Sequence, residues 1–155
     1  WGHPDDALVP ELDLLGWDAL GRLQEDGVEL GAHTRTHPDL TALREDAALR
    51  DELEGCALRM EAETGRRPRA FAYPFGHHDE RCVEAVGDLY DVAVTTELRP
   101  LGPAPDPRRL PRLEMVYFRR PGLLDGWGSA AFRRYLWLRR AGRRVRAMAR
   151  QGGRS

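Results

Sequence analysis

The sequence predicts an α/β fold, because short apolar segments of strand character alternate with amphipathic helical segments. Two observations support this prediction: apolar residues recur at helical spacing in three segments, and short Val-, Ala- or Phe-containing runs separate or follow these segments. The expected strands are residues 28–32, 70–73 and 92–94, with a further short strand at 113–116. Alternation of strands with helices favours parallel pairing of the strands.

Three helices are expected from apolar spacing and from residues that start or end helices. The first contains Trp17, Leu20 and Leu23 and ends before Gly27. The third starts after Asp79, a suitable N-cap, and ends near Gly87. The second carries the clearest apolar stripe and is closed by a glycine: Leu49, Leu53, Cys56, Met60 and then Gly65.

The composition is that of a folded globular chain of 155 residues, 41% hydrophobic and 32% charged. No apolar run approaches the roughly 20 residues of a membrane-spanning helix, so no transmembrane segment is expected. Residues 1–30 also lack the basic and apolar regions of a signal peptide. Cys56 and Cys82 have neither the number nor the spacing of a disulfide framework or a zinc ribbon, and we expect both thiols to be structural.

The charge distribution divides the chain into an acidic body, residues 1–118, and an arginine-rich extension, residues 119–155. The extension holds 11 Arg and one Asp, and the chain contains no Lys. Its residues 130–151 predict a basic helix whose apolar stripe comprises Ala131, Tyr135, Leu138, Val145 and Ala149. A helix packed on the body with a solvated arginine face is the favoured interpretation, and contact with an anionic surface is the alternative. Nucleic acid is not an expected partner, because no base-reading motif accompanies the charge.

The most informative motif is His33-Thr34-Arg35-Thr36-His37-Pro38, which directly follows a predicted strand. Two imidazoles four residues apart converge if the residues between them form one helical turn, and neutral imidazole is the commonest protein ligand for zinc-like metals. Two exposed loop histidines are the alternative for any such pair. The preceding strand and the following proline favour a metal site formed by His33 and His37.

The segment 27–40 around these histidines resembles the second motif of the NodB-type polysaccharide deacetylases, carbohydrate esterase family 4. Phe71-Ala72-Tyr73-Pro74-Phe75-Gly76 is similar to the third motif of that family, and residues 92–96 and 110–113 are similar to later segments. The resemblance runs from about Leu14 to Met115. It implies a partial, irregular (β/α) barrel, and an N-terminally incomplete deacetylase domain at residues 1–118.

The resemblance also implies an activity: metal-dependent hydrolysis that removes acetyl groups from N-acetylated amino-sugar polysaccharides. A divalent metal, zinc in many members, would be held by His33 and His37 together with an aspartate. It would activate a water molecule for attack on the acetyl carbonyl once a second aspartate accepts the proton. The backbone N–H of Phe75 would stabilise the oxyanion. Tyr73, Pro74 and Gly76 would lie against the acetylated glycan, and the cell envelope is the compartment usual for the family.

Three departures from the family pattern accompany this resemblance. The Thr-Phe-Asp-Asp type motif with both aspartates is missing, and Asp5-Asp6 is too close to His33 and lacks a preceding strand. The usual arginine of the third motif is replaced by Ala72, for which Arg112 is a candidate substitute, the alternative being a structural or surface arginine. The late histidine is also missing, which leaves His77 or His78 as a proton donor or as exposed loop residues. We therefore expect this stretch alone to be inactive, and a non-catalytic NodB-like module that binds glycan or an anionic surface is the alternative function.

Overall fold

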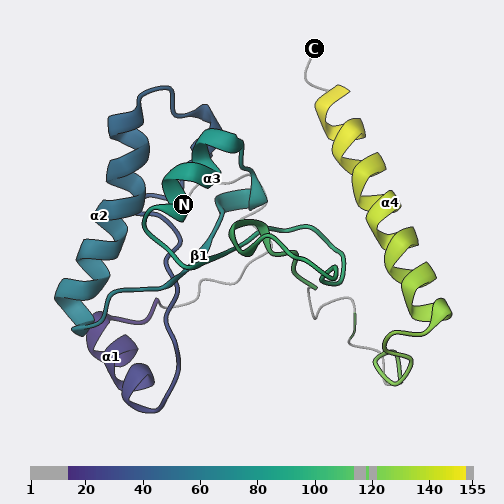
Figure 1. Ribbon diagram of the computed structural model, residues 1–155, viewed down its shortest axis with the longest axis horizontal. Coiled ribbons are helices and arrows are strands. Elements are labelled where there is room, and N and C mark those ends of the chain that lie inside the picture. The colour runs from purple at the N-terminus through teal and green to yellow at the C-terminus, as the bar shows by residue number, and fades with distance from the viewer. Residues whose placement is uncertain (1–13, 114–117, 119–121, 153–155) are drawn as a thin grey trace. The chain divides into compact units, whose positions relative to one another are not determined.

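The computed structural model describes residues 14–113, 118 and 122–152 (Figure 1). The chain divides into two compact units, which are described separately. Unit 1 comprises Trp1–Thr95 with Asp106–Arg109, and unit 2 comprises Thr96–Pro105 with Leu110–Ser155. The predicted division between residues 118 and 119 concerns the limits of a family domain, and it stays a prediction.

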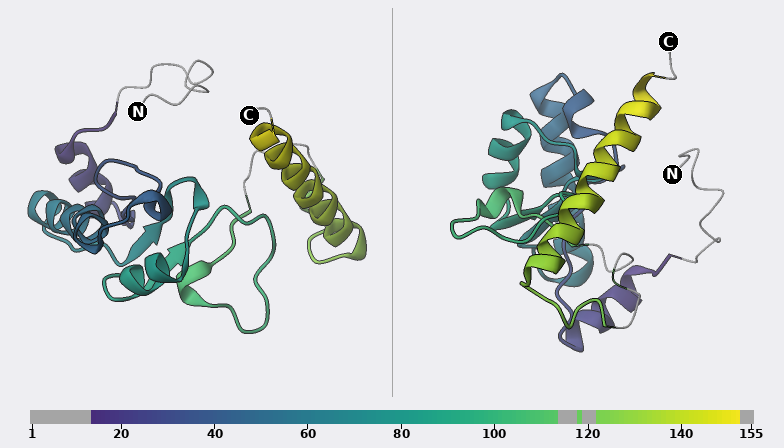
Figure 2. Two further views of the ribbon diagram at one scale, coloured as in Figure 1. Left: turned by 90° about the horizontal axis from the view of Figure 1, so that it is seen from above. Right: turned by 90° about the vertical axis from the view of Figure 1, so that its right-hand side faces the viewer.

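The described residues of unit 1 form three α-helices and a small parallel sheet (Figures 1 and 2). The helix α2 packs against both α1 and α3. The strands β1 and β2 pair in parallel, with Phe71 opposite Ala93. The helices, strands and short 3-10 turns are α1 (Trp17–Glu25), η2 (Leu40–Ala42), α2 (Asp46–Thr64), β1 (Ala70–Ala72), η3 (Pro74–Gly76), α3 (Glu80–Gly87), β2 (Val92–Val94) and η4 (Pro107–Arg109).

The three helices confirm the sequence prediction, including two of their ends. Gly65 closes α2 with a φ of 72°, a left-handed conformation that glycine adopts without the steric cost of a side chain. Asp79 caps α3, because its carboxylate accepts a hydrogen bond from the backbone N–H of Cys82. Both ends were predicted because they depend on residue types that are specific for helix termini.

The first predicted strand, residues 28–32, is wrong in length. Only Ala32 pairs, in an isolated parallel bridge with Phe71. The Ala32 N–H donates to the Ala70 carbonyl at 2.8 Å, and the Ala72 N–H donates to the Ala32 carbonyl at 2.9 Å. The apolar pattern therefore located the element correctly but not its extent. Of the strand predicted at 113–116, residues 114–116 lie outside the described residues.

The core of unit 1 lies between α2, α3 and the sheet. Phe71 of β1 is almost fully buried and contacts the rings of Tyr73 and Tyr90. The Tyr90 hydroxyl donates to the backbone carbonyl of Leu53 at 2.7 Å, which satisfies this buried polar group. The predicted apolar stripe of α2 is buried in this core, and both cysteines are free, buried thiols. Burial raises the pKa of Cys82 to about 11, so its thiol stays protonated at neutral pH.

Unit 2 contains the helix α4 (Ala130–Gly152) and a small apolar cluster. The cluster is formed by Phe118, Phe132 and Leu136, with Tyr135 partly buried against it. The predicted apolar stripe of this helix is wrong at two positions, because Ala131 and Leu138 are exposed while Phe132 and Leu136 are buried. The side chains of Val145 and Ala149 lie outside the description. Within the described residues, no helix is both long and apolar enough to cross a membrane.

Candidate active site

The loop from His33 to His37 begins where the chain leaves the sheet at Ala32. Two residues of this loop have positive φ angles, 65° at Thr34 and 61° at His37. The loop is closed on itself by a hydrogen bond of 3.0 Å from the His37 N–H to the Thr34 hydroxyl. The chain thus makes a tight turn that brings the side chains at its two ends together.

His33 and His37 face one another across this turn. Their Nε2 atoms lie 3.1 Å apart, and their ring centroids are separated by 4.7 Å. The Nδ1 atom of His33 lies 2.7 Å from the carbonyl oxygen of Ala72 in β1. A carbonyl only accepts, so Nδ1 carries the proton and the Nε2 of a neutral His33 is left with its lone pair.

The environment favours neutral imidazole at His37. Desolvation lowers its pKa below the ordinary value, and the neighbouring His33 lowers it further. Only a neutral imidazole can donate a lone pair to a metal. The electrostatic environment of His37 therefore suits metal ligation.

The third motif lies against the histidines. Phe75, in η3, has a φ of 58°, and its ring meets that of His37 edge-on at a centroid distance of 4.8 Å. Its side chain is 43% exposed. The left-handed conformation at Phe75 is followed by another at Gly76, where glycine avoids the cost of a side chain. The structure thus places Phe75 beside His37 in a strongly turned segment.

Tyr73 and Pro74 are buried on the inner side of the same segment. Tyr73 is 2% exposed, and its hydroxyl donates to the Arg108 carbonyl at 2.9 Å. Burial is the main cause that raises the pKa of Tyr73 well above its ordinary range. Tyr73 thus packs in the interior of unit 1, and its predicted contact with a glycan stays a prediction.

His77 and His78 extend the third motif in different directions. The Nδ1 of His77 lies 2.8 Å from a carboxylate oxygen of Asp39, two residues after His37. Burial raises the pKa of Asp39, but hydrogen bonds from Thr41 and His77 outweigh it and the net pKa is lowered. His78 instead packs on Tyr73 and places its Nδ1 3.0 Å from the Gly76 carbonyl oxygen. Of the two, His77 is the exposed histidine paired with a carboxylate.

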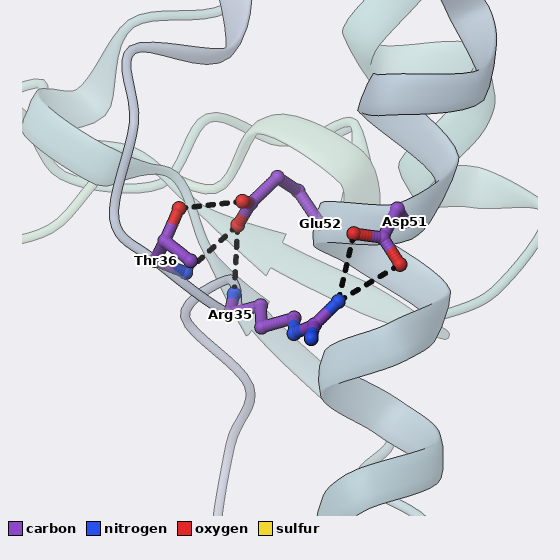
Figure 3. Close-up of polar contacts among 4 residues, drawn as sticks. All are labelled: Arg35, Thr36, Asp51 and Glu52. Carbon is purple, nitrogen blue, oxygen red and sulfur yellow. Dashed lines mark hydrogen bonds and ion pairs between the residues drawn. The ribbon is translucent and has the colours of Figure 1, made fainter.

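A carboxylate on α2 that was not predicted from the sequence holds the histidine loop. Glu52 accepts hydrogen bonds from the backbone N–H groups of Arg35 and Thr36 and from the Thr36 hydroxyl (Figure 3). The adjacent Asp51 pairs instead with the Arg35 guanidinium, at 2.9 Å. The signal available in the sequence was a carboxylate on the apolar side of α2, one residue before Leu53.

The residues present fit one half of a divalent metal site. Two nitrogens about 2.0–2.1 Å from one zinc ion at a tetrahedral angle lie roughly 3.3–3.4 Å apart. The observed Nε2 separation of 3.1 Å differs from this by a few tenths of an ångström. A ligating histidine that donates its other N–H to a backbone carbonyl is the usual arrangement, and His33 has it. Among the described residues, no group of three or more His, Cys, Asp or Glu side chains could hold a metal.

The polysaccharide deacetylase family model matches residues 5–90, which is more than half of the chain. The chain belongs to the polysaccharide deacetylase family. The match confirms the resemblance, although it starts before Leu14 and ends before the later segments at 92–96 and 110–113. Comparison with curated protein sequences gives no match.

Solved structures of deacetylases share the fold of this chain. BC0361, a polysaccharide deacetylase from Bacillus cereus, is 26% identical, with a TM-score of 0.58 over 70% of this chain and 34% of its own. The Streptococcus pyogenes deacetylase PplD is 20% identical, with a TM-score of 0.61 over 70% of this chain and 48% of its own. The BpsB deacetylase domain of Bordetella bronchiseptica is 18% identical, with a TM-score of 0.59 over 67% and 52%. The chain thus spans between about a third and a half of these proteins. The described residues show a partial fold of this deacetylase type, without a closed barrel.

The structure brings together His33, His37 and Phe75, three of the predicted site residues of this family member. Arg112 belongs to unit 2, where its N–H donates to the Glu97 carbonyl at 2.9 Å, and its role in the site stays a prediction. Asp5 and Asp6 lie within the family match but outside the described residues.

Proposed function

We propose that the protein is a metal-dependent deacetylase that removes acetyl groups from N-acetylated amino-sugar polysaccharides. The observation that supports this most is the His33–His37 pair, with Nε2 atoms 3.1 Å apart, in a chain of the polysaccharide deacetylase family. BC0361 is a polysaccharide deacetylase, and we propose an acetylated polysaccharide as the substrate of this chain as well.

His33 and His37 would hold the metal, for which we propose zinc, through their Nε2 atoms. The metal would supply Lewis acidity toward the acetyl carbonyl and toward the attacking water. The Ala72 carbonyl keeps the His33 proton on Nδ1, so that the lone pair on Nε2 stays directed at the metal position. With two ligands among the described residues, we expect residues 14–152 alone to bind zinc weakly and to be inactive.

Phe75 would act through its backbone and through its side chain. Its N–H belongs to the turned segment beside His37 and would donate to the oxyanion that develops on the acetyl oxygen. Its exposed ring, next to His37, would stack on a sugar ring of the glycan. Gly76, which has no side chain, would let the glycan approach this backbone closely.

Of the two histidines, we propose His77 for proton transfer to the leaving amine. Asp39 fixes its ring through Nδ1 at 2.8 Å, which leaves Nε2 as the atom that would carry the transferred proton. His78 is held by the Gly76 carbonyl and packs on Tyr73, so we assign it a structural role. Arg112 remains a proposed source of positive charge for the site.

Acetate release tests the proposed activity. The full natural protein, with zinc added, would be incubated with an N-acetylated amino-sugar oligosaccharide and with an O-acetylated oligosaccharide of similar length. We expect acetate from the N-acetylated substrate, with loss of activity in His33→Ala. Release from the O-acetylated substrate alone would contradict the proposed substrate class. Release that survives His33→Ala and His37→Ala would contradict the proposed site.

A second candidate function is binding of an anionic glycan or surface through α4. The exposed Arg133, Arg134 and Arg139 lie on this helix, and Trp137 on the same helix is 65% exposed. Arginine and tryptophan together are suited to a negatively charged, partly apolar partner. This role would be independent of the histidines, and the two functions are separated by variants of α4 that leave unit 1 unchanged.

A further inference from the structure

The histidine loop has a backbone that its own sequence does not favour. Thr34 and His37 both have positive φ angles, which only a few per cent of non-glycine residues adopt and which are outliers for a β-branched residue such as threonine. Such conformations persist where the surroundings hold them. The spacing of the two histidine side chains therefore depends on contacts made to the middle of the loop.

The backbone N–H groups in the middle of the loop donate to one carboxylate on α2. One oxygen of Glu52 accepts from the Arg35 N–H at 2.9 Å and from the Thr36 N–H at 2.8 Å. The other oxygen accepts from the Thr36 hydroxyl at 2.5 Å. Glu52 is 9% exposed, so water cannot easily replace it as the acceptor. Figure 3 shows the side chain reaching from α2 to the loop, with all three hydrogen bonds made to consecutive residues.

Glu52 is not itself a ligand in this arrangement. Its oxygens are directed at Arg35 and Thr36, and it does not form a metal-binding group with His33 and His37 among the described residues. The residues that it holds lie between the two histidines. Its carboxylate is thus placed to set the geometry of the histidine pair without touching the metal.

We propose that Glu52 is a positioning residue that keeps the Nε2 atoms of His33 and His37 at the separation that one metal ion requires. The inference rests on the proposed metal ligation by these histidines. Removing an outer partner that orients metal ligands typically costs 10–100-fold in metal affinity. Glu52→Ala should therefore weaken zinc binding by roughly that factor.

Asp51 supplies a matched control from the same helix. It contacts the same loop, but through the exposed guanidinium of Arg35 rather than through the backbone. An exposed ion pair of this kind contributes little to stability. Asp51→Ala should leave zinc affinity within about twofold of the wild type, since it does not alter the loop backbone.

The experiment combines zinc calorimetry with amide hydrogen exchange on wild type, Glu52→Ala, Glu52→Gln and Asp51→Ala. We expect Glu52→Ala to weaken zinc binding and to speed exchange of the Arg35 and Thr36 amides. Glu52→Gln, which keeps one carbonyl oxygen, should retain part of both properties. A folded Glu52→Ala that binds zinc like the wild type would overturn the inference.

Further outcomes are separated when His33→Ala and His37→Ala are added to this set of proteins. If Glu52→Ala does not fold, Glu52→Gln decides: a normal unfolding midpoint with lowered zinc affinity supports positioning, and unchanged affinity overturns it. Wild-type binding that is indifferent to His33→Ala and His37→Ala overturns the proposed metal site first, and the inference with it. Zinc binding that requires the histidines but not Glu52 overturns the inference alone.

Discussion

The Nδ1 atom of His33 lies 2.7 Å from the carbonyl oxygen of Ala72, so the second sequence motif is joined directly to the strand that leads into the third. This contact fixes the protonated nitrogen of His33 and turns its Nε2 toward His37. It uses a backbone group, and so it does not depend on the identity of residue 72. The alanine at this position still provides the acceptor that orients the first proposed ligand.

Zinc affinity should rise with pH across the histidine range and then level off. Both imidazoles must be neutral to ligate, and the lowered pKa of His37 means that protons compete less at this residue than at an ordinary histidine. Calorimetric titrations between about pH 5 and 8 would measure this dependence. Without zinc, His37 contributes stability above its unfolded pKa of roughly 6.5, and this is lost as pH falls through the lower folded value. Affinity that is independent of pH would contradict ligation by neutral histidines.

Asp79→Ala should lower the free energy of unfolding by about 1 kcal/mol, because α3 loses the side chain that accepts from the Cys82 N–H. Hydrogen bonding to that backbone N–H lowers the pKa of Asp79. Its contribution is therefore present above the unfolded pKa of about 3.9 and is lost as pH falls through the folded value. Urea unfolding at neutral and acid pH would show both effects. Glu84→Ala, at an exposed position of the same helix, is the control and should change stability little.

Gly65→Ala and Gly21→Ala should change stability in opposite directions. Neither new methyl group would meet an atom within 4 Å, so steric contact is not the cause. Gly65 has a φ of 72°, which disfavours alanine by about 1 kcal/mol, whereas Gly21 lies within α1, where alanine is favoured by roughly the same amount. Thermal unfolding of the two variants would measure this. A destabilised Gly21→Ala would contradict the description of α1.

The parts of unit 1 that the sequence predicted are those set by local signals. The end of α2 was predicted from Gly65 and the start of α3 from Asp79. The buried faces of both helices were predicted from the spacing of their apolar residues. The first strand was overestimated because its apolar run pairs only at Ala32, which depends on the position of Phe71 in the fold. The stripe of α4 was misassigned because Phe132 and Leu136, not Ala131 and Leu138, face the cluster around Phe118.

For the site, the sequence indicated which residues meet but not what holds them. The spacing of His33 and His37 and the third motif predicted the group that the structure assembles with Phe75. The contribution of Glu52 depends on how α2 packs against the loop, a contact between residues 16 and 17 positions apart. The Asp39–His77 pair spans 38 positions and was likewise not predicted. The sequence places Glu52 on the apolar side of α2, but it does not show which residues a tertiary contact of this kind will join.

A variant in which Arg133, Arg134 and Arg139 are replaced by Gln should elute from an acidic-polysaccharide column at lower salt than the wild type. The three exposed guanidinium groups on α4 would contribute electrostatic attraction that salt screens. Zinc affinity should not change. The control replaces Arg44, Arg50 and Arg59 of unit 1 by Gln, with the same change in net charge. Equal shifts in the two variants would show that only net charge matters and would exclude a specific surface on α4.

Zinc calorimetry at about pH 7 is the decisive measurement of whether His33 and His37 hold a divalent metal. The wild-type chain would be compared with the double variant His33→Ala/His37→Ala, and with His77→Ala as a histidine control outside the proposed ligand pair. We expect one zinc ion bound per wild-type chain, no binding to the double variant, and wild-type affinity in His77→Ala. Zinc binding of equal affinity in the wild type and the double variant would contradict this expectation.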